Sequence, residues 1–359
     1  MKKEIVVDAR MAANSGIGTY IRSILPRIKD AYRLRILIHR ETSLKCPELA
    51  CIEQIFTLAP LYSIQEQIAL PLVIPRCDLF WSPHFNVPLA PVRAKKRLTT
   101  IHDVFFLAHP KSIGIHKQMY TRFMFGAAAR RSDHLITGSQ FSFSEIIKYV
   151  GSYQHKITEI PLGIDRHIFS ASLDLERPAF ALPSKYILYV GNLALHKNIV
   201  RLIQSLDFLP KDIHLVLVGK ETRDNFWKQE AQKRIDRITL CGEIDRTTLA
   251  WIYRHATLLI HPSLYEGFGL TPLEAMSAGC PVVVSQIPCL KETCGDAAVF
   301  VDPMSPQAIA EGISSVWQNL ALQQTLQEKG HKHSQKFCWQ RSAERHLEII
   351  ERLLSQSSV

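Results

Sequence analysis

The sequence predicts an α/β protein of two domains, each built on a doubly wound parallel sheet. Three observations lead to this prediction. Short apolar runs alternate with longer amphipathic segments along most of the chain, which is the pattern of repeated strand–helix units. The length of 359 residues suits two domains that each bury a core. An irregular stretch at residues 166–184, containing Pro178 and Pro183, separates two series of units. We therefore expect a first domain over 1–170, a second over 171–338 and a final helical segment over 339–359.

Each half of the chain supplies its own strands, most of them short and almost entirely apolar, as in parallel sheets covered on both faces. In the first half we expect strands at residues 3–8, 34–38, 79–82, 98–101, 133–137 and 156–160, and helices at 21–28, 62–74, 113–131 and 139–149. In the second half we expect strands at residues 186–190, 213–218, 238–240, 257–260, 281–285 and 297–301, and a last helix at 340–355.

The composition is typical of a soluble globular enzyme, with 47% hydrophobic and 21% charged residues. The sequence has no run of 18 apolar residues and no signal peptide, so we expect a cytoplasmic protein. Its eight cysteines form no Cys-x-x-Cys pair and are expected to be reduced. No metal-ligand spacing is present, and the segment 331–333, which contains two histidines, is expected to be a solvated helix face.

The positive charge is concentrated in the first half of the chain. Residues 1–170 contain 23 Lys and Arg against 13 Asp and Glu, whereas residues 171–359 contain 20 of each. This imbalance favours an anionic partner. Because no nucleic-acid-binding motif is present, we expect no nucleic acid and prefer an anionic membrane surface or a phosphorylated acceptor. The helix at 113–131 interleaves apolar and basic residues, so it suits either the core or a membrane interface, and the basic run 93–97 is expected to be a solvated loop.

The stretch from His261 to Gly279 holds the clearest candidate site. It joins two expected strands through a glycine-containing loop and a new helix, with Thr271 as the expected N-cap and Gly279 just beyond the helix end. The free amides and the dipole of such a helix start form an anion site. Two carboxylates, Glu266 and Glu274, flank the loop. A phosphate on the amides and hydroxyl groups on the carboxylates would suit a sugar nucleotide, although Glu274 also fits a capping box with Thr271.

Three further strand ends carry polar or glycine-rich sequence. Gly16 and Gly18 follow the first strand, without the third glycine and the later acidic residue of an NAD site, so an ordinary strand–helix turn remains an alternative. His102 and Asp103 follow the strand at 98–101, where His102 either reacts or caps local backbone. Lys197 is expected in a first helical turn, where a cation suggests a bound anion or else a solvated side chain.

The segment Glu266-x7-Glu274, with the sequence Gly-Phe-Gly-Leu-Thr-Pro-Leu-Glu-Ala-Met-Ser-Ala-Gly after Glu266, is similar to the signature of retaining GT-B glycosyltransferases of family four, the group 1 transferases. The resemblance implies two Rossmann-like domains facing a cleft, with the last helix crossing back to the first domain. It implies that Glu266 lies by the donor sugar and that Glu274 holds the nucleotide ribose. The diphosphate would meet the loop amides of Gly267, Phe268, Gly269, Leu270 and Thr271.

Other segments match the same family. The resemblance implies that Gly16 and Gly18 face the donor diphosphate and that His102, followed by Asp103, lies against the donor sugar. In the loop that begins at Gly191, Lys197 matches a lysine that neutralises the diphosphate. His196 stands where the family often has an arginine, which puts one phosphate contact in doubt. The backbone near Ile244 would meet the nucleotide base.

What the resemblance implies is a retaining, metal-independent hexosyltransferase with no cofactor besides its nucleotide-sugar co-substrate. Likeness to bacterial mannosyltransferases of surface polysaccharide suggests GDP-mannose as donor and a glycan or lipid-linked saccharide as acceptor. A peripheral position on the inner face of the cytoplasmic membrane is expected from the basic first half. The alternatives are a UDP-sugar donor, a phosphorylase with pyridoxal phosphate, and a non-catalytic nucleotide-sugar-binding protein.

Overall fold

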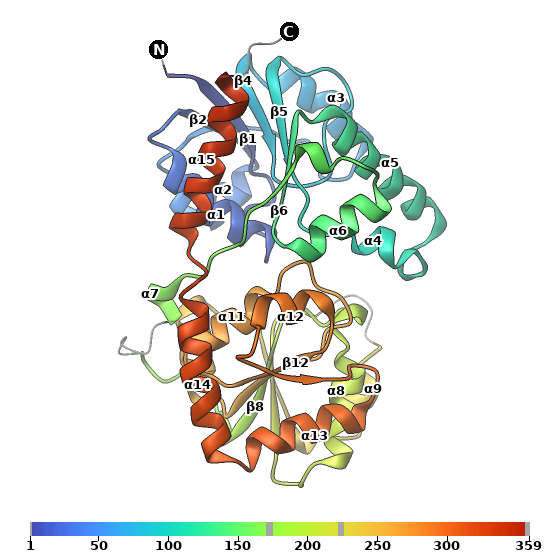
Figure 1. Ribbon diagram of the computed structural model, residues 1–359, viewed down its shortest axis with the longest axis vertical. Helices are drawn as coiled ribbons and strands as arrows, with labels where there is room; N and C mark the ends of the chain where they lie inside the picture. Colours follow the sequence, from blue (N-terminus) through green and yellow to red (C-terminus); the bar gives the residue numbers. More distant parts are fainter. Residues whose placement is uncertain (1, 170–174, 222–225, 356–359) are drawn as a thin grey trace. The chain divides into compact units, whose positions relative to one another are not determined.

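The computed structural model describes residues 2–169, 175–221 and 226–355 (Figure 1). The chain forms two compact units, unit 1 from Met1–Gly163 with Trp339–Val359, and unit 2 from Ile164–Cys338. Unit 1 thus ends at Gly163 and not at residue 170, because the short helix α7 (Arg166–Phe169) buries Phe169 against Tyr253 of unit 2. Residues 170–174 of the expected linker lie outside the described residues.

Unit 1 contains a seven-stranded parallel sheet in the order β3-β2-β1-β4-β5-β6-β7. The order reverses between β1 and β4, so the loops that follow these two strands diverge and leave a crevice at the carboxyl edge. The strands are β1 (Glu4–Asp8), β2 (Arg33–Ile38), β3 (Glu53–Phe56), β4 (Cys77–Ser82), β5 (Ala94–Thr100), β6 (His134–Thr137) and β7 (Ile157–Glu159).

Helices cover both faces of this sheet (Figure 1). The crossovers from β3 to β4 and from β5 to β6 run toward the β7 edge, so right-handed connections place α3 and α5 on one face and α1 on the other. The helices of unit 1 are α1 (Ile17–Ile28), α2 (Arg40–Lys45), α3 (Ile64–Val73), α4 (Phe105–Ala108), α5 (Ile115–Arg131), α6 (Gln140–Tyr149) and α15 (Trp339–Ser355).

The final helix, α15, packs against α1 inside unit 1. His346 of α15 is fully buried, and its Nε2 atom accepts a hydrogen bond from the Tyr20 hydroxyl at 2.5 Å, while its Nδ1 atom donates to the Ser342 carbonyl at 2.7 Å. Thr100 of β5 joins the same group through Tyr20 and Trp81, at 3.0 Å each. This buried polar cluster fixes the register of α15 on the sheet, because each member needs a partner to offset its loss of water.

Unit 2 contains a six-stranded parallel sheet in the order β10-β9-β8-β11-β12-β13, which reverses between β8 and β11. The strands are β8 (Tyr186–Val190), β9 (His214–Val218), β10 (Ile238–Gly242), β11 (Leu258–His261), β12 (Val282–Ser285) and β13 (Val299–Val301). After α7, its helices are α8 (Ile199–Ser205), α9 (Lys228–Gln232), α10 (Arg246–His255), α11 (Leu270–Ser277), α12 (Pro288–Cys294), α13 (Pro306–Trp317) and α14 (Leu320–Ser334).

These two sheets confirm the predicted pair of doubly wound parallel α/β domains. Two strands of unit 1 differ from the prediction. The edge strand β3 was not predicted, because its four residues are half-exposed and lack an apolar run. The basic run at residues 93–97 is not a solvated loop, since β5 begins at Ala94 and carries Lys95 and Lys96 to acidic partners on neighbouring segments, Asp78 at 2.7 Å and Asp133 at 3.5 Å.

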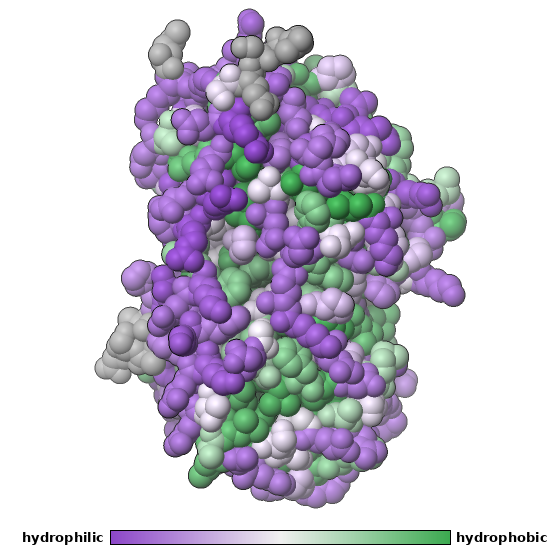
Figure 2. Space-filling model, in the orientation of Figure 1, coloured by the Kyte–Doolittle hydropathy of each residue, from purple (hydrophilic) through white to green (hydrophobic). Residues whose placement is uncertain are grey.

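The cysteines and the helices bear on two other predictions. All eight cysteines are free thiols, five of them buried, as expected for a reduced protein. None of the helices in the described residues combines the length and apolar character needed to cross a bilayer. The visible face of unit 1 is mostly hydrophilic, whereas that of unit 2 carries a broad hydrophobic area bordered by hydrophilic side chains (Figure 2).

Candidate functional site

The switch point of unit 2 brings together two loops, one after β8 and one after β11. Their backbones are tied by a hydrogen bond from the Leu264 amide to the His196 carbonyl, at 2.8 Å. A third loop, after β9, approaches so closely that a Cβ atom added to Gly219 would lie 2.1 Å from the Gly191 carbonyl oxygen. Gly219 also has a φ of +137°, which only glycine adopts without strain. The sheet edge is therefore tightly built around the start of the Gly191 loop.

Lys197, Glu266 and His261 form the polar centre of this edge. The Lys197 Nζ atom lies 2.7 Å from Glu266 Oε1, and the His261 Nε2 atom lies 2.7 Å from the same oxygen. The side chains of Lys197 and Glu266 are only 16% and 12% exposed, so water screens the pair weakly. Both contacts use Oε1, and neither engages the second carboxylate oxygen, which suits a hydroxyl-bearing ligand.

The charge state of Glu266 follows from these neighbours. Burial alone favours the neutral acid, but the Lys197 ammonium and His261 outweigh it and hold the pKa of Glu266 well below its usual range. Glu266 is therefore a carboxylate at neutral pH. Glu266 also has a structural role, since one of its oxygens is the shared partner of two other side chains.

The backbone that presents Lys197 differs from the prediction. Lys197 ends a 3-10 turn, Leu195–Lys197, and helix α8 begins only at Ile199, so Lys197 does not lie in a first α-helical turn. Asn198 between them is left-handed, with a φ of 62°. Its side-chain amide is buried and donates to the carbonyls of Pro262 and Pro303, at 3.0 and 2.6 Å. These two bonds hold the strained residue in place and aim Lys197 toward the β11 loop.

Helix α11 starts two residues earlier than predicted. Gly269, with a φ of +99°, is the N-cap residue and Leu270 is the first helical residue, so Thr271 is not the N-cap. A Cβ atom on Gly269 would lie 2.7 Å from Leu290, which explains why the chain has glycine here. Gly279 lies just beyond the helix end with a φ of +78°, as predicted. The segment from Gly267 to Thr271 thus forms a loop and helix start whose amides suit an anion.

Phe268 anchors the loop that precedes helix α11. Its ring is buried, lies edge-on to Phe337, and its carbonyl accepts a hydrogen bond from the Thr293 hydroxyl of α12. With the side chain anchored, the backbone amides on either side of Phe268 are held in one geometry. This is the preorganised arrangement that anion binding requires.

Glu274 is not part of a capping box, because Thr271 does not cap α11. Its Oε2 atom instead accepts a hydrogen bond from the Tyr253 hydroxyl of α10, at 3.3 Å. Burial raises the pKa of Glu274 to about 7, against the opposing influence of Arg246. Glu274 is therefore a hydrogen-bonding carboxyl group that is partly protonated at neutral pH. Ile244, expected near the nucleotide base, follows β10 at the same sheet edge, two strands from β8.

His102 and Asp103 lie in unit 1, directly after β5. The His102 Nε2 atom donates to the Pro83 carbonyl at 3.1 Å, so the predicted backbone-capping contact is present. Burial lowers the pKa of His102 to about 4, which makes it a neutral imidazole at neutral pH. Asp103 accepts a hydrogen bond from the Phe105 amide at 2.9 Å and so closes the turn into α4.

The glycine loop of unit 1 lies near the same histidine. Gly16 is the N-cap of α1 with a φ of +35°, and a Cβ atom added to it would meet no atom of the described residues within 4 Å, so there is room beside the loop. Gly18 is different, because its Cβ would lie 2.4 Å from the Ala12 carbonyl oxygen. Tyr20, two residues after Gly18 in α1, packs edge-on against His102, with the two ring centroids 4.9 Å apart. The structure therefore brings the loop and His102 together.

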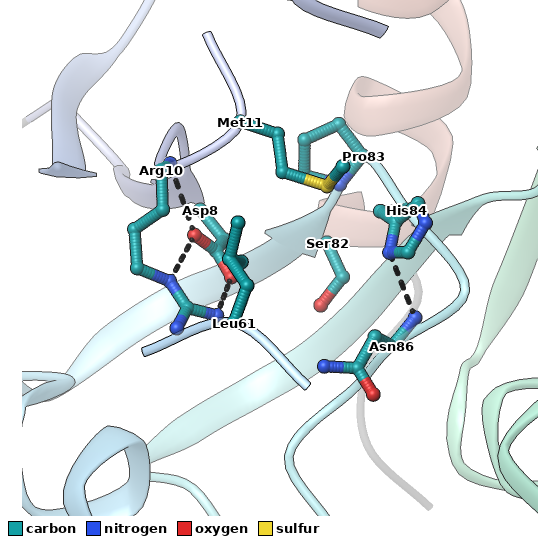
Figure 3. Close-up of a pocket in the computed structure, with 8 residues that line it drawn as sticks. All are labelled: Asp8, Arg10, Met11, Leu61, Ser82, Pro83, His84 and Asn86. Carbon is teal, nitrogen blue, oxygen red and sulfur yellow. Dashed lines mark hydrogen bonds and ion pairs between the residues drawn. The ribbon is translucent and has the colours of Figure 1, made fainter. Parts of the chain in front are cut away.

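A small pocket lies at the switch point of unit 1, where β1 and β4 end (Figure 3). It was not predicted. The buried Arg10 guanidinium pairs with Asp8 at 2.6 Å on its wall, and the Asn86 amide N–H contacts His84 Nδ1 at 3.3 Å. The lining residues are Asp8, Arg10, Met11, Leu61, Ser82, Pro83, His84 and Asn86.

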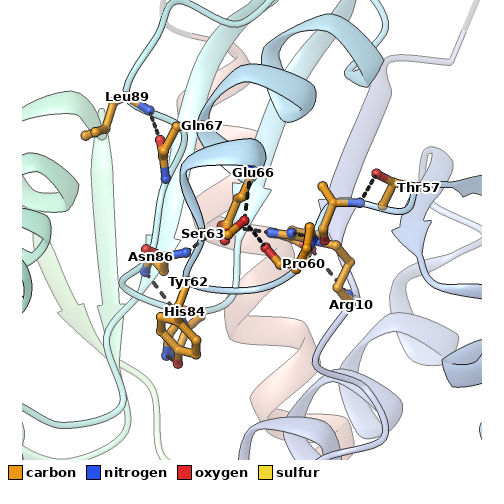
Figure 4. Close-up of polar contacts among 12 residues, drawn as sticks. Arg10, Thr57, Pro60, Tyr62, Ser63, Glu66, Gln67, His84, Asn86 and Leu89 are labelled. Atoms are coloured by element: carbon orange, nitrogen blue, oxygen red, sulfur yellow. Dashed lines mark hydrogen bonds and ion pairs between the residues drawn. The ribbon is translucent and has the colours of Figure 1, made fainter.

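A network of hydrogen bonds extends from this pocket into helix α3 (Figure 4). Arg10 also pairs with Glu66 at 3.1 Å, and the Asn86 side chain donates to Glu66 at 2.5 Å. Tyr62, whose φ of 58° is unusual for a tyrosine, contacts His84 at 2.9 Å. The sequence signal for this group is the Asp8-x-Arg10 pattern at the end of a buried strand.

Two residues of the unit 2 site also escaped prediction as functional residues. His261 ends β11, five residues before Glu266, and its buried Nδ1 atom has no hydrogen-bond partner among the described residues. Tyr253 lies on α10 and donates a hydrogen bond to Glu274, which is 21 residues away in the sequence, so no local sequence pattern predicts this contact. Across the described ranges, no three His, Cys, Asp or Glu side chains are grouped so that they could hold a metal ion.

Comparison with known proteins identifies the family. The glycosyl transferases group 1 family matches residues 174–333. Over 281 residues the chain is 30% identical to the O-antigen chain mannosyltransferase B of Escherichia coli, covering 73% of this chain and 71% of that protein. It is 27% identical to the O-antigen chain mannosyltransferase RfbU of Salmonella typhimurium, covering 67% of this chain and 65% of that one.

Solved structures share the fold at low sequence identity. The Anabaena protein HepE, in complex with UDP and glucose, superposes with a TM-score of 0.80 at 16% identity, covering 98% of this chain and all of that one. With the parallel sheets of both units and the E. coli relative, this likeness shows that the chain has the GT-B fold and belongs to the glycosyl transferases group 1 family.

Proposed function

We propose that the protein transfers a hexose from a nucleotide sugar to a glycan or lipid-linked saccharide acceptor, with retention of the anomeric configuration and without a metal ion. The observation that carries the proposal is the cluster of Lys197, Glu266 and His261 beside the start of α11. It places a cation, a carboxylate and a set of fixed amides at one switch point, where α/β sheets bind their ligands.

In this proposal the diphosphate is the leaving group. Lys197 and the amides from Gly267 to Thr271 stabilise the negative charge that grows as the bond between the sugar C1 and the phosphate oxygen breaks. The acceptor oxygen bonds to C1 on the same face, and its proton passes to the departing phosphate oxygen. Glu266, ionised and rigidly held, orients the sugar hydroxyls through its second oxygen. Glu274 is assigned to the ribose.

The resemblance assigns further residues to the same reaction. His196 and the Gly191 loop are proposed to meet the diphosphate, and Ile244 the base. From unit 1, His102 is assigned to the donor sugar and the loop of Gly16 and Gly18 to the phosphates. A neutral His102, as the structure has it, suits hydrogen bonding to a sugar hydroxyl better than it suits phosphate binding.

We propose GDP-mannose as the donor and surface-polysaccharide synthesis as the pathway. The mannosyltransferases of E. coli and Salmonella named above support this choice, and so do the segments around Gly18, His102 and Lys197. A UDP-sugar is the competing donor, supported by the UDP and glucose bound in HepE. Action at the cytoplasmic face of a membrane is part of the proposal, since a lipid-linked acceptor and a basic first half both suit it.

A panel of GDP-mannose, UDP-glucose and UDP-N-acetylglucosamine, offered with extracted lipid-linked acceptors, tests the proposal. We expect labelled mannose to be transferred, the rate to be unchanged by EDTA, and the product anomer, determined by NMR, to match that of the donor. Transfer from UDP-glucose alone would replace the donor assignment. Donor binding with neither transfer nor hydrolysis would instead support the non-catalytic alternative.

A further inference from the structure

We propose that the outer face of helix α3 inserts into the interfacial layer of an anionic lipid bilayer. This inference deepens the proposed membrane association and does not depend on which sugar is transferred. The face consists of Ile64, Ile68 and Leu72, which we call the α3 stripe.

Helix α3 exposes a row of aliphatic side chains in addition to the apolar residues that it packs against the core, which is unusual for a helix on a soluble domain. Four of its residues are exposed, and three of them are the members of the α3 stripe, with 82%, 64% and 72% of Ile64, Ile68 and Leu72 open to solvent. Amphipathic surface helices normally turn such residues to the core. The spacing of i, i+4 and i+8 keeps the three side chains in one row.

The orientation of α3 is fixed by a buried carboxylate. Glu66 is fully buried, pairs with Arg10 at 3.1 Å and accepts a hydrogen bond from Asn86. Leu70, one turn later, is also fully buried. Positions two residues away lie about 200° around a helix, so the inward Glu66 and Leu70 force the α3 stripe outward. The fold therefore exposes aliphatic residues and keeps a charged one inside, which a soluble surface alone does not require.

In the described part of unit 2, no two of the large exposed apolar side chains share a helix. Phe180, Leu195, Phe208, Ile235, Leu240, Met304 and Leu320 lie on seven separate segments. Single exposed apolar residues of this kind are ordinary, whereas a row on one helix marks an interaction surface.

Helix α5, on the same face of the sheet, supplies cations and a second row. Ile115, Met119 and Phe123 are 62%, 66% and 54% exposed at the same spacing. The protruding edge of unit 1 where α5 lies carries hydrophobic and hydrophilic side chains side by side (Figures 1 and 2). Lys117 and Arg122 are exposed on this helix, and no acidic residue occurs between positions 104 and 132.

The two helices are joined through one side chain. Asn86 donates to Glu66 of α3 and accepts from the Tyr120 hydroxyl of α5, both at 2.5 Å. A rigid link between an aliphatic row and a cationic helix suits an anionic membrane surface, where apolar side chains enter the headgroup layer and cations remain near the phosphates. A second copy of the chain would bring like charges together, so we commit to lipid.

Vesicle sedimentation tests the proposal directly. The double variant Ile68→Gln, Leu72→Gln should bind vesicles of phosphatidylcholine and phosphatidylglycerol at least about tenfold more weakly than the wild type, since it removes two inserted side chains. The salt dependence of vesicle binding by this variant should equal that of the wild type, because the two substitutions change no charge. The matched control is Met304→Gln, Leu320→Gln, which removes two exposed apolar residues from unit 2 and should bind like the wild type.

Three results would overturn the inference. One is binding of the α3 variant within about twofold of the wild type, which excludes a role for the stripe. Another is a wild-type dimer in sedimentation that the α3 variant converts to a monomer, which would assign the face to a second copy. The third concerns Ile68→Trp, whose emission should shift to the blue with anionic vesicles; an unshifted emission means that position 68 stays in water.

Discussion

Lys197 and Glu266 lie 69 residues apart in the sequence, yet Nζ of the first is 2.7 Å from Oε1 of the second, at the switch point of unit 2. The pair is mostly buried, and His261 shares its carboxylate oxygen. A ligand phosphate that contacts Lys197 would therefore join an existing network. The first two predictions follow from this relationship.

Replacing Glu266 separates its roles in charge and in packing. Glu266→Gln should abolish transfer and lower the free energy of unfolding by about 1–3 kcal/mol, because Lys197 loses its counter-charge in a poorly solvated site. Glu266→Ala should destabilise unit 2 more, since His261 then loses its acceptor as well. Transfer assays and urea unfolding measure the two effects. Glu221→Gln, which breaks an exposed pair with Lys228, should leave both within error.

Lys197 should be needed for the diphosphate and not for the nucleoside. Lys197→Met should weaken binding of GDP much more than binding of guanosine and should slow transfer by about 2–4 kcal/mol of barrier. Isothermal calorimetry and single-turnover kinetics give the two values. Equal losses for GDP and guanosine would mean that the variant disturbs the loop and not a phosphate contact. The control is Lys220→Met, in the loop after β9, because the side chain of Lys220 is exposed.

Glu274 should make the stability of unit 2 depend on pH. Its folded pKa of about 7 lies above the ordinary value of 4.5, so the folded state holds the proton more tightly than the unfolded state. Its favourable contribution is complete below about pH 4.5 and is lost as pH rises through 7, by up to about 3 kcal/mol. Glu274→Gln should flatten the unfolding free energy over this range, as followed by urea titrations. The exposed Glu328→Gln should not.

Unit 1 should be sensitive to acid because of its buried histidines. Burial lowers the pKa of His134, His346 and His102 to about 4 each. These depressed values stabilise the fold above about pH 6.5, and the contribution, up to about 3 kcal/mol for each histidine, is lost as pH falls toward 4. Emission from Trp81, 5.4 Å from His346, reports the transition. His346→Gln should reduce the pH dependence, and a curve as steep as that of wild type would contradict the assignment.

The glycine after β9 should tolerate no side chain. Gly219→Ala places a Cβ atom 2.1 Å from the Gly191 carbonyl, and at a φ of +137° it should cost about 3 kcal/mol or more of unfolding free energy. Gly242→Ala is the matched control, because its φ is also positive but no atom lies within 4 Å. It should cost only about 1 kcal/mol of backbone strain. Thermal unfolding distinguishes the two.

The sequence predicted the strands that are fully apolar, such as β8 and β11, and the loop between Glu266 and Glu274. It did not predict how these residues are paired. Nothing near Glu266 reveals that Lys197 and His261 share one of its oxygens, because such contacts form only when separate strand ends meet at the sheet edge. For the same reason the alternative of a capping box between Thr271 and Glu274 was wrong, since the partner of Glu274 is Tyr253 from a preceding helix.

Local rules also failed where glycine replaced a capping side chain or where charges were paired between strands. Thr271 is a good N-cap by composition, but Gly269 can enter the left-handed region and starts α11 earlier. A run of basic residues such as that around Lys95 and Lys96 is typical of a solvated loop. In the structure both lysines lie on strand β5, where they pair with Asp78 and Asp133, 17 and 37 positions away in the sequence. The exposed aliphatic row of α3 is hidden in the sequence because the sequence does not show that Glu66 points inward.

Helix α15 gives unit 1 a property that unit 2 lacks. Unit 2 is one continuous stretch of chain, so all of its residues have been synthesised before α15 is begun. Unit 1 is begun before unit 2, but the buried group around Tyr20 and Trp81 is complete only after His346 of α15 has been synthesised. During translation unit 1 is therefore completed after unit 2, and a premature stop before His346 would damage unit 1 while leaving the chain of unit 2 complete.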